Sequence, residues 1–132
     1  MKFSGAAWFL PFAAWMTLVL YLSFSPLSGW PQQGFFERLY LDKVIHLFMY
    51  SVLTFLLLWG YQRRERRRPS QQTAWLLVAA CAAVGLIIEI LQPVLTRYRT
   101  HELPDMLANA AGAALGYLLT LWRPVQMRTG LQ

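Results

Sequence analysis

Charged side chains are scarce in this 132-residue sequence. Asp, Glu, Lys and Arg together make up 14% of the residues, whereas soluble domains contain about 25%. Hydrophobic residues account for 57%, above the roughly 45–50% of soluble domains. A water-soluble domain needs a charged coat, so these proportions argue against one and favour a membrane protein. The length allows one domain at most.

Two further shortages restrict the chemistry. Cys81 is the only cysteine, which rules out an internal disulfide and a metal site built from paired cysteines. Acidic residues number 6 against 12 basic ones, so any acid inside an apolar segment needs an explanation. Aromatic residues, by contrast, make up 15% of the chain, which is too many for an intrinsically disordered protein.

Apolar residues gather into four segments that approach or reach the about 20 residues needed to cross a hydrocarbon core. They cover residues 6–24, 44–61, 74–92 and 105–122. The first is too long for the apolar core of a signal peptide and is followed by no cleavage site, so we interpret it as a retained span. The pattern predicts one all-α domain over residues 1–132, an integral membrane bundle of four transmembrane helices. Residues 35–41 mix aromatic and charged side chains and predict a separate short helix in the membrane interface.

The basic residues predict the orientation of the bundle. Four spans place the N-terminus, the loop after the second span and the C-terminus on one side, which collects eight Lys and Arg residues, five of them in residues 63–68. The opposite side collects four. Because basic loops stay in the cytoplasm, both termini are predicted to be cytoplasmic, with the protein in an inner (cytoplasmic) membrane. A topology signal on anionic headgroups explains the arginine run more simply than nucleic acid does, so no nucleic-acid partner is expected.

Small residues form stripes on the third and fourth spans. Ala82 and Gly85 lie at helical spacing, and so do Ala108, Gly112 and Gly116. Such stripes let helices approach closely in lipid. We therefore expect the third and fourth spans to pack against each other along these faces. The glycines also offer a face for dimerisation, and the sequence leaves the oligomeric state open.

Polar residues inside or beside the spans gather at one depth. A charged side chain at the centre of a membrane helix costs about 2.5–3.5 kcal/mol, so such residues are usually functional. On the predicted topology they lie at the start of the second span, the end of the third and the start of the fourth, within about two helical turns of the outer face. Arg97 and Arg99 lie in the loop directly above. The residues in the spans are Asp42, Lys43, His46, Tyr50, Glu89, Gln92, Asp105 and Asn109.

This set is compatible with a general acid and base, a divalent metal site or a clamp for an anionic headgroup, because it offers imidazole, carboxylate and cationic groups. Simpler explanations also exist. Asp42 and Asp105 stand at the starts of predicted helices, where an acidic side chain stabilises the helix end. Lys43 is typical of a residue that anchors a span at the membrane interface. His46 alone is compatible with a hydrogen-bonded interfacial histidine. Glu89 has the weakest such explanation, because an acid within an apolar span normally needs a partner or a water-filled cavity.

Several motifs stand in the order of a known family. Residues 42–50 read DKVIHLFMY, residues 85–92 read GLIIEILQ, residues 109–116 read NAAGAALG, and residues 21–26 read YLSFSP, with Arg99 six residues before Asp105. This order resembles the VanZ-like family of small bacterial integral membrane proteins, and the resemblance covers nearly the whole chain. It implies a four-span helical membrane protein. The family's namesake is associated with resistance to the glycopeptide antibiotic teicoplanin, so the resemblance also implies a link to that resistance. It implies no particular reaction.

Two hypotheses for function follow. In the first, the protein is an enzyme at the outer face that acts on an anionic envelope lipid or a lipid-linked precursor, with a divalent metal as a compatible cofactor. In the second, it is an accessory membrane protein that captures a lipid headgroup or a partner without any reaction. A proton-linked transporter is less favoured, because no titratable residue lies at mid-depth. For the enzyme, we assign catalytic roles to His46, Glu89, Asp42 and Asp105, and substrate binding to Lys43, Tyr50, Gln92, Arg99 and Asn109.

Overall fold

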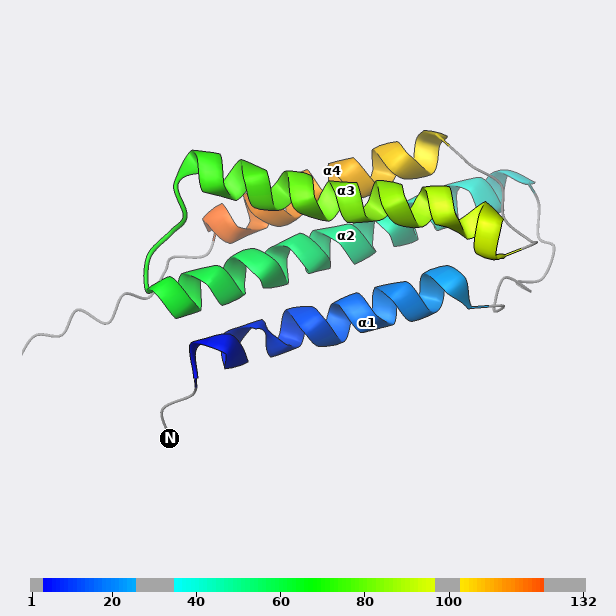
Figure 1. Ribbon diagram of the computed structural model, residues 1–132. Helices are drawn as coiled ribbons and strands as arrows, with labels where there is room; N and C mark the ends of the chain where they lie inside the picture. Colours follow the sequence, from blue (N-terminus) through cyan, green and yellow to red (C-terminus); the bar gives the residue numbers. More distant parts are fainter. Residues whose placement is uncertain (1–3, 26–34, 97–102, 123–132) are drawn as a thin grey trace, which may run out of the picture.

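The computed structural model describes residues 4–25, 35–96 and 103–122, and within these ranges every element is helical. A short 3-10 helix, η1 (Gly5–Phe9), leads into α1 (Leu10–Phe24). Three longer helices follow: α2 (Phe35–Glu65), α3 (Gln71–Leu95) and α4 (Leu103–Trp122). Successive helices run in opposite directions (Figure 1). The prediction of an all-α bundle with four helices is therefore confirmed.

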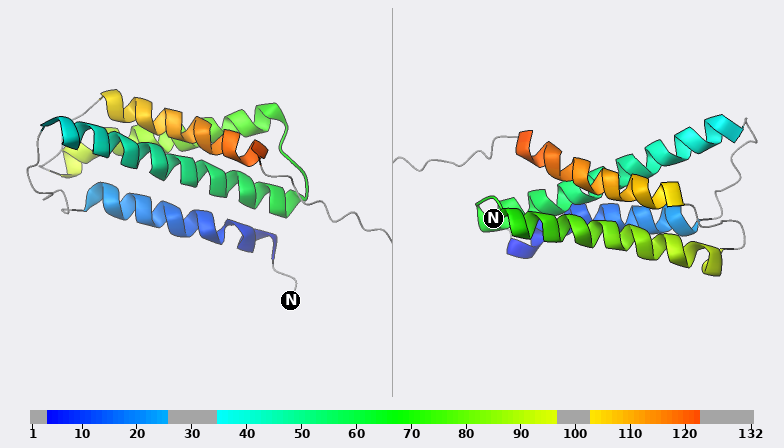
Figure 2. Two further views of the ribbon diagram at one scale, coloured as in Figure 1. Left: turned by 180° about the vertical axis from the view of Figure 1, so that it is seen from behind. Right: turned by 90° about the horizontal axis from the view of Figure 1, so that it is seen from above.

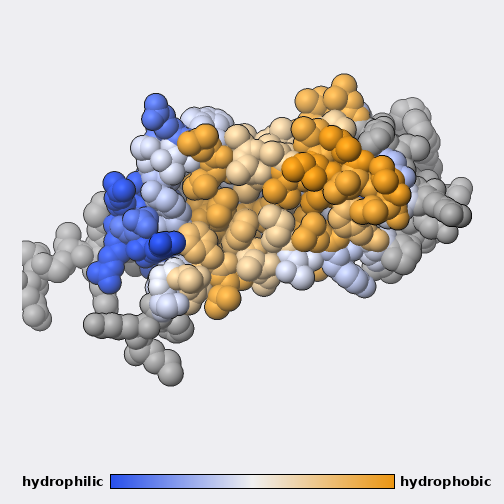
Figure 3. All heavy atoms as spheres, in the orientation of Figure 1, coloured by the Kyte–Doolittle hydropathy of each residue, from blue (hydrophilic) through white to orange (hydrophobic). Residues whose placement is uncertain are grey.

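The alternating direction gives the bundle two chemically different ends. One end gathers the starts of α2 and α4 and the last turns of α1 and α3 (Figure 1, right), and we call it the polar end because it carries Asp42, His46 and Asp105. The opposite end follows the last turn of α2, and we call it the arginine end. Figure 3 shows a broad apolar band between a strongly hydrophilic arginine end and the polar end. The arginine end is defined by Arg63, Arg64, Arg66, Arg67 and Arg68.

Helix α2 is the longest helix and the central one, with α1 on one side and α3 and α4 on the other (Figures 1 and 2). At 1.5 Å per residue its 31 residues extend about 46 Å, which exceeds the roughly 30 Å of a hydrocarbon core. The expectation of a separate interfacial helix at residues 35–41 is wrong, because these residues form the first turns of α2. No proline or glycine separates them from the apolar part of the helix. The helix ends before Arg66, whose φ of 55° turns the chain toward α3.

Helix α3 is longer at both ends than the predicted span of residues 74–92. Its start is set by Ser70, whose hydroxyl accepts a hydrogen bond from the Thr73 amide at 3.2 Å. Its last turn contains Pro93, which we had expected to begin the loop. Proline removes one helical hydrogen bond, the one to the carbonyl four residues earlier, and the turn closes through Thr96 instead. Both the amide and the hydroxyl of Thr96 donate to the Gln92 carbonyl, at 2.7 and 2.6 Å.

Three helices are long and apolar enough to cross a membrane among the residues that the structure describes. They are Gly5–Phe24, Tyr40–Glu65 and Gln71–Leu95. Helix α4 is not one of them, because Asp105 and Asn109 make its first half more polar. Large apolar side chains such as Leu76, Val94 and Leu107 are exposed on the outside of the bundle. An apolar exterior over three such helices is typical of a protein that lies in lipid.

The glycines of α4 pack against α2, and our expectation that they face α3 is wrong. A Cβ atom added at Gly112 would clash with the carbonyl oxygen of Leu47, and one added at Gly116 would clash with that of Ser51. The Ser51 hydroxyl donates to the Gly112 carbonyl at 3.0 Å. Close backbone contact of this kind is the reason that membrane helices carry small residues. Because this face is used within one chain, it is unavailable for dimerisation.

Helix α3 supplies a glycine of its own to the centre of the bundle. A Cβ atom at Gly85 would lie 2.9 Å from Cε1 of Tyr50 and 3.0 Å from Cβ of Asn109. The absence of a side chain at Gly85 therefore leaves room for one residue from α2 and one from α4. Helix α1 is held separately, by the Trp15 indole, whose Nε1 donates to the Met49 carbonyl at 2.9 Å.

Candidate functional site

The polar end combines side chains from α2 and α4. Asp42, His46 and Tyr50 follow one another at intervals of four residues on α2, so they lie along one face of that helix. Asp105 and Asn109 have the same spacing in the first turns of α4. The close approach of α2 and α4 at the glycines brings these two faces together. The geometry of the site therefore depends on packing about one to two helical turns beyond Asn109.

Lys43 and Asp105 join the two helices at the outer edge of this cluster. The Lys43 ammonium donates to Oδ1 of Asp105 at 3.1 Å. The Asp105 side chain is only 6% exposed, whereas that of Lys43 is 23% exposed. A nearly buried carboxylate needs such a partner, because removal of its hydration is costly. The sequence predicts that Lys43 binds an anionic group of the substrate. In the structure the anion that Lys43 binds is the carboxylate of Asp105.

His46 lies one turn deeper, and Asn109 fixes its orientation. Nδ1 of His46 lies 2.8 Å from Oδ1 of Asn109 in a buried hydrogen bond. Because an amide oxygen only accepts, Nδ1 carries the proton in this bond. Nε2 points toward the carboxylate of Asp42, 3.7 Å from its Oδ1. The imidazole is nearly buried, at 9% exposed, whereas the Asp42 side chain is 38% exposed and opens the cluster to the outside.

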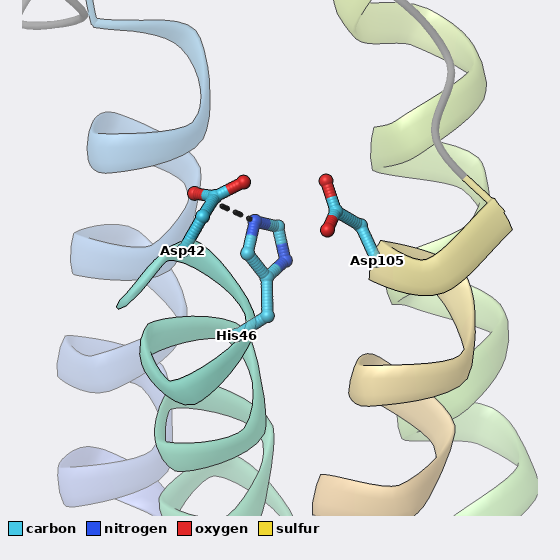
Figure 4. A group of neighbouring side chains, drawn as sticks. All are labelled: Asp42, His46 and Asp105. Carbon is cyan, nitrogen blue, oxygen red and sulfur yellow. Dashed lines mark ion pairs between the residues drawn. The ribbon is translucent and has the colours of Figure 1, made fainter. Parts of the chain in front are cut away.

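The His46 ring lies between the carboxylates of Asp42 and Asp105 (Figure 4). One oxygen or nitrogen atom from each of the three residues lies within 4.8 Å of the other two. This arrangement can hold a proton between the imidazole and a carboxylate, or a cation among all three. It thereby brings together three of the four residues to which the sequence assigned catalytic roles.

The fourth, Glu89, lies apart from these three and beside Tyr50. Both residues are almost completely buried, and they interact electrostatically. Tyr50 follows His46 by one turn on α2, so this pair lies further into the bundle than the His46 ring. Glu89 also precedes Pro93 by four residues, so its carbonyl lacks the usual helical donor. The carboxylate thus belongs to a second, dry layer beneath the first.

Gln92 is buried but is directed toward α1. Its side-chain amide donates to the backbone carbonyl of Ser23 at 2.9 Å and so links α3 to α1. No sequence pattern points to this partner, because every residue has a backbone carbonyl. The other unforeseen contact, from Ser51 to Gly112, is hidden for the same reason. Arg97 and Arg99, expected above the site, lie outside the described residues.

The helical bundle and its apolar exterior define a membrane protein with a polar cluster at one end. Residues 3–124 match the family described as VanZ/LLP1. Because this match covers most of the sequence, the chain belongs to the VanZ/LLP1 family, and the resemblance seen in its motifs is confirmed.

The chain also has a curated relative. The chain is 33% identical over 111 residues to the uncharacterized protein C11E3.10 of Schizosaccharomyces pombe. The alignment covers 83% of this chain and 60% of the relative, so the chain spans about 60% of the relative's length. No solved structure matches the chain.

Proposed function

We propose that the chain crosses a bacterial inner membrane four times, with α4 as the fourth span and both termini in the cytoplasm. The 20 residues of α4 extend about 30 Å, the thickness of a hydrocarbon core. Its polar side chains Asp105, Asn109 and Thr120 are buried in the bundle, whereas Leu107 and Leu118 are exposed. Because the polar side chains face the bundle and leucines face outward, α4 is better suited to a membrane than its mean hydropathy indicates. The excess of basic residues supports a cytoplasmic position for the arginine end.

Single-cysteine labelling tests this topology. In a Cys81→Ala background, Tyr40→Cys reports on the polar end and Arg67→Cys on the arginine end, and both positions are exposed. A membrane-impermeant maleimide should label Tyr40→Cys in intact cells but reach Arg67→Cys only after permeabilisation. The opposite pattern contradicts the orientation, and labelling of both sites in intact cells contradicts the four-span arrangement.

We further propose that the polar end is the site of an enzyme that acts on an anionic envelope lipid or a lipid-linked precursor. The supporting observation is the buried His46 ring, held by Asn109 between two carboxylates at the mouth of the bundle. His46 exchanges a proton with the substrate, Asn109 orients its ring, and Asp42 and Asp105 balance its charge. Lys43 binds the anionic group of the substrate once the lysine has left Asp105. Glu89 acts as a second acid or base in the deeper layer.

Comparison of lipids in wild-type, deletion and complemented cells tests the enzyme. The deletion should change the covalent structure of a lipid, and the wild-type gene should restore it. His46→Gln and Glu89→Gln should each fail to restore it while keeping wild-type expression. Glu65→Gln makes the same carboxylate-to-amide change as Glu89→Gln at an exposed position of the arginine end, and it should complement fully. Full complementation by both His46→Gln and Glu89→Gln would rule out these catalytic roles.

A binding or accessory role is the second candidate. It is favoured by the pairing of Lys43 with Asp105 and of His46 with Asn109, since both pairs join α2 to α4 and so give these polar residues a structural role. In this role the cluster recognises an anionic headgroup and no bond is broken. The purified protein should then bind phosphatidylglycerol vesicles more strongly than phosphatidylcholine vesicles, and the deletion should leave every lipid covalently unchanged. A covalent change in lipids favours the enzyme instead.

The link to teicoplanin is a separate proposal that rests on the namesake of the family. It is measured as the minimal inhibitory concentration of teicoplanin for deletion, wild-type and overexpressing strains. A role in resistance predicts a lower value in the deletion strain and a higher one on overexpression. Equal values in all three strains contradict it.

A further inference from the structure

We propose that Asp42, His46 and Asp105 form a binding site for a divalent transition metal ion at the polar end of the bundle. The three side chains offer one nitrogen and two oxygen ligand atoms, all within 4.8 Å of one another. They come from two helices whose relative position is fixed by backbone contact at Gly112. Figure 4 shows the two carboxylates on either side of the imidazole ring.

The orientation of His46 is the observation that points to a cation. Because Nδ1 donates its proton to Asn109, the opposite nitrogen, Nε2, is left with its lone pair directed at the Asp42 carboxylate. At 3.7 Å from Oδ1 of Asp42 this atom is too distant for a hydrogen bond. A lone pair that faces a carboxylate is unfavourable unless a positive charge lies between them. A histidine that donates its other ring nitrogen to an oxygen is also the usual arrangement of a metal ligand.

The exposure of the three residues suits an ion that enters from outside. The side chains of His46 and Asp105 are nearly buried, whereas that of Asp42 is 38% exposed and lies at the entrance. Bonds of about 2.1 Å to a tetrahedral zinc ion place two ligand atoms roughly 3.4 Å apart, so ligand atoms that are now separated by as much as 4.8 Å must draw together by up to about 1.4 Å. Rotation of the exposed Asp42 side chain supplies part of this movement, and release of Asp105 from Lys43 allows the second carboxylate to approach the ion.

The ligand set indicates which ions fit. An imidazole nitrogen with two carboxylates suits Zn²⁺ or Mn²⁺, whereas Mg²⁺ prefers oxygen ligands and retains its water. Three protein ligands leave at least one position open, as in catalytic rather than structural zinc sites. Lys43 competes for the site, because its ammonium occupies Oδ1 of Asp105 at 3.1 Å. Metal binding therefore requires this ion pair to open, and while the ion is bound His46 serves as a ligand and does not exchange a proton with the substrate.

Calorimetric titration of the purified, chelator-treated full chain in detergent tests the site. ZnCl₂ and MnCl₂ should bind with saturable 1:1 stoichiometry, and MgCl₂ should bind much more weakly. Asp42→Asn, His46→Gln and Asp105→Asn should each abolish saturable binding. Asn109→Ala should weaken it roughly 10–100-fold, the range for partners that orient a metal ligand. Glu65→Gln, at the arginine end, is the matched control and should bind as the wild type does.

Two measurements keep the proposal testable even if a ligand variant fails to fold. Lys43→Gln should bind Zn²⁺ about fivefold more tightly, as expected when a partly exposed ion pair no longer competes. In addition, the electron spin echo of the Mn²⁺-loaded wild type should carry a nitrogen coupling from a coordinated imidazole. The absence of saturable binding, or binding that survives in all three ligand variants, overturns the proposal. A lack of nitrogen coupling in the Mn²⁺-loaded protein, or weaker Zn²⁺ binding in Lys43→Gln, overturns the proposal as well. If no saturable metal binding is found, a second proton on His46 is the positive charge that lies between the carboxylates.

Discussion

Gly116→Ala should destabilise the protein, because the backbones of α2 and α4 touch at this residue. The added Cβ atom would clash with the Ser51 carbonyl oxygen and lie 2.9 Å from Cβ of Thr54 and 3.1 Å from the amide nitrogen of Phe55. Two carbon atoms normally pack at about 3.5 Å or more. The helices must therefore separate by at least roughly 0.6 Å, the shortfall at Thr54, since neither its Cβ atom nor the Ser51 carbonyl can rotate away as the end of a side chain can.

Two opposing contributions set the magnitude. Overpacking of a close-packed interior costs about 1–3 kcal/mol, whereas replacement of a helical glycine by alanine gains about 1 kcal/mol of helix propensity. The same separation would lengthen the 3.0 Å bond from Ser51 to the Gly112 carbonyl to about 3.6 Å, beyond hydrogen-bond range. We therefore expect a net loss of about 1–2 kcal/mol in the free energy of unfolding.

Tryptophan fluorescence of the purified chain during heating in detergent measures this loss. At about 4 °C per kcal/mol for a chain of this size, Tm should fall by about 4–8 °C. Ala111→Ser adds one heavy atom to the exposed face of the same helix and should leave Tm within about 2 °C of the wild-type value. A Gly116→Ala protein with a Tm at or above that of the wild type would show that the α2 and α4 backbones are not in contact at this position.

Three further predictions concern the contacts that join the helices. A double-mutant cycle with His46→Ala and Asn109→Ala should give a coupling energy of about 0.6–1.7 kcal/mol in detergent unfolding, the range for hydrogen bonds between membrane helices, and a value of zero contradicts their 2.8 Å bond. Gln92→Leu should cost about 1–3 kcal/mol of stability by leaving the Ser23 carbonyl without its donor, and limited proteolysis should then release α1 first. Gly85→Val should lower Tm more than Gly116→Ala does, because its larger side chain meets two helices at once; an unchanged melting curve contradicts that packing.

The depth of the polar residues was predictable from the sequence. Rise per residue along a helix is constant, so the distance of His46, Glu89 or Asp105 from the end of its span can be counted along the chain. That count places residues of three helices at one end, and the structure has them there. The same regularity made the helices and their order predictable, although proline and aromatic residues misled the boundaries at residues 35–41 and at Pro93.

The partners of these residues were not predictable in the same way. Lys43 pairs with Asp105, although no pattern in the sequence singles out Lys43 as the partner of this carboxylate. Gln92 shares a helical face with Glu89, yet it bonds a carbonyl of α1. Contacts of this kind depend on the rotation of each helix about its axis, and a single sequence constrains that rotation only through the width of its apolar stripe.

The sequence by itself determined a membrane protein with helices of sufficient length, a basic end, and acids and a histidine gathered at the other end, because composition and helical rise are local properties. Only the tertiary structure decided that the glycines of α4 pack on α2. That packing sets the distance between the two backbones, and it thereby brings the Asp105 carboxylate and the Asn109 amide of α4 to the His46 ring of α2. The cluster exists because α2 and α4 pack closely. That packing depends on many contacts along both helices, so no single sequence motif predicts it.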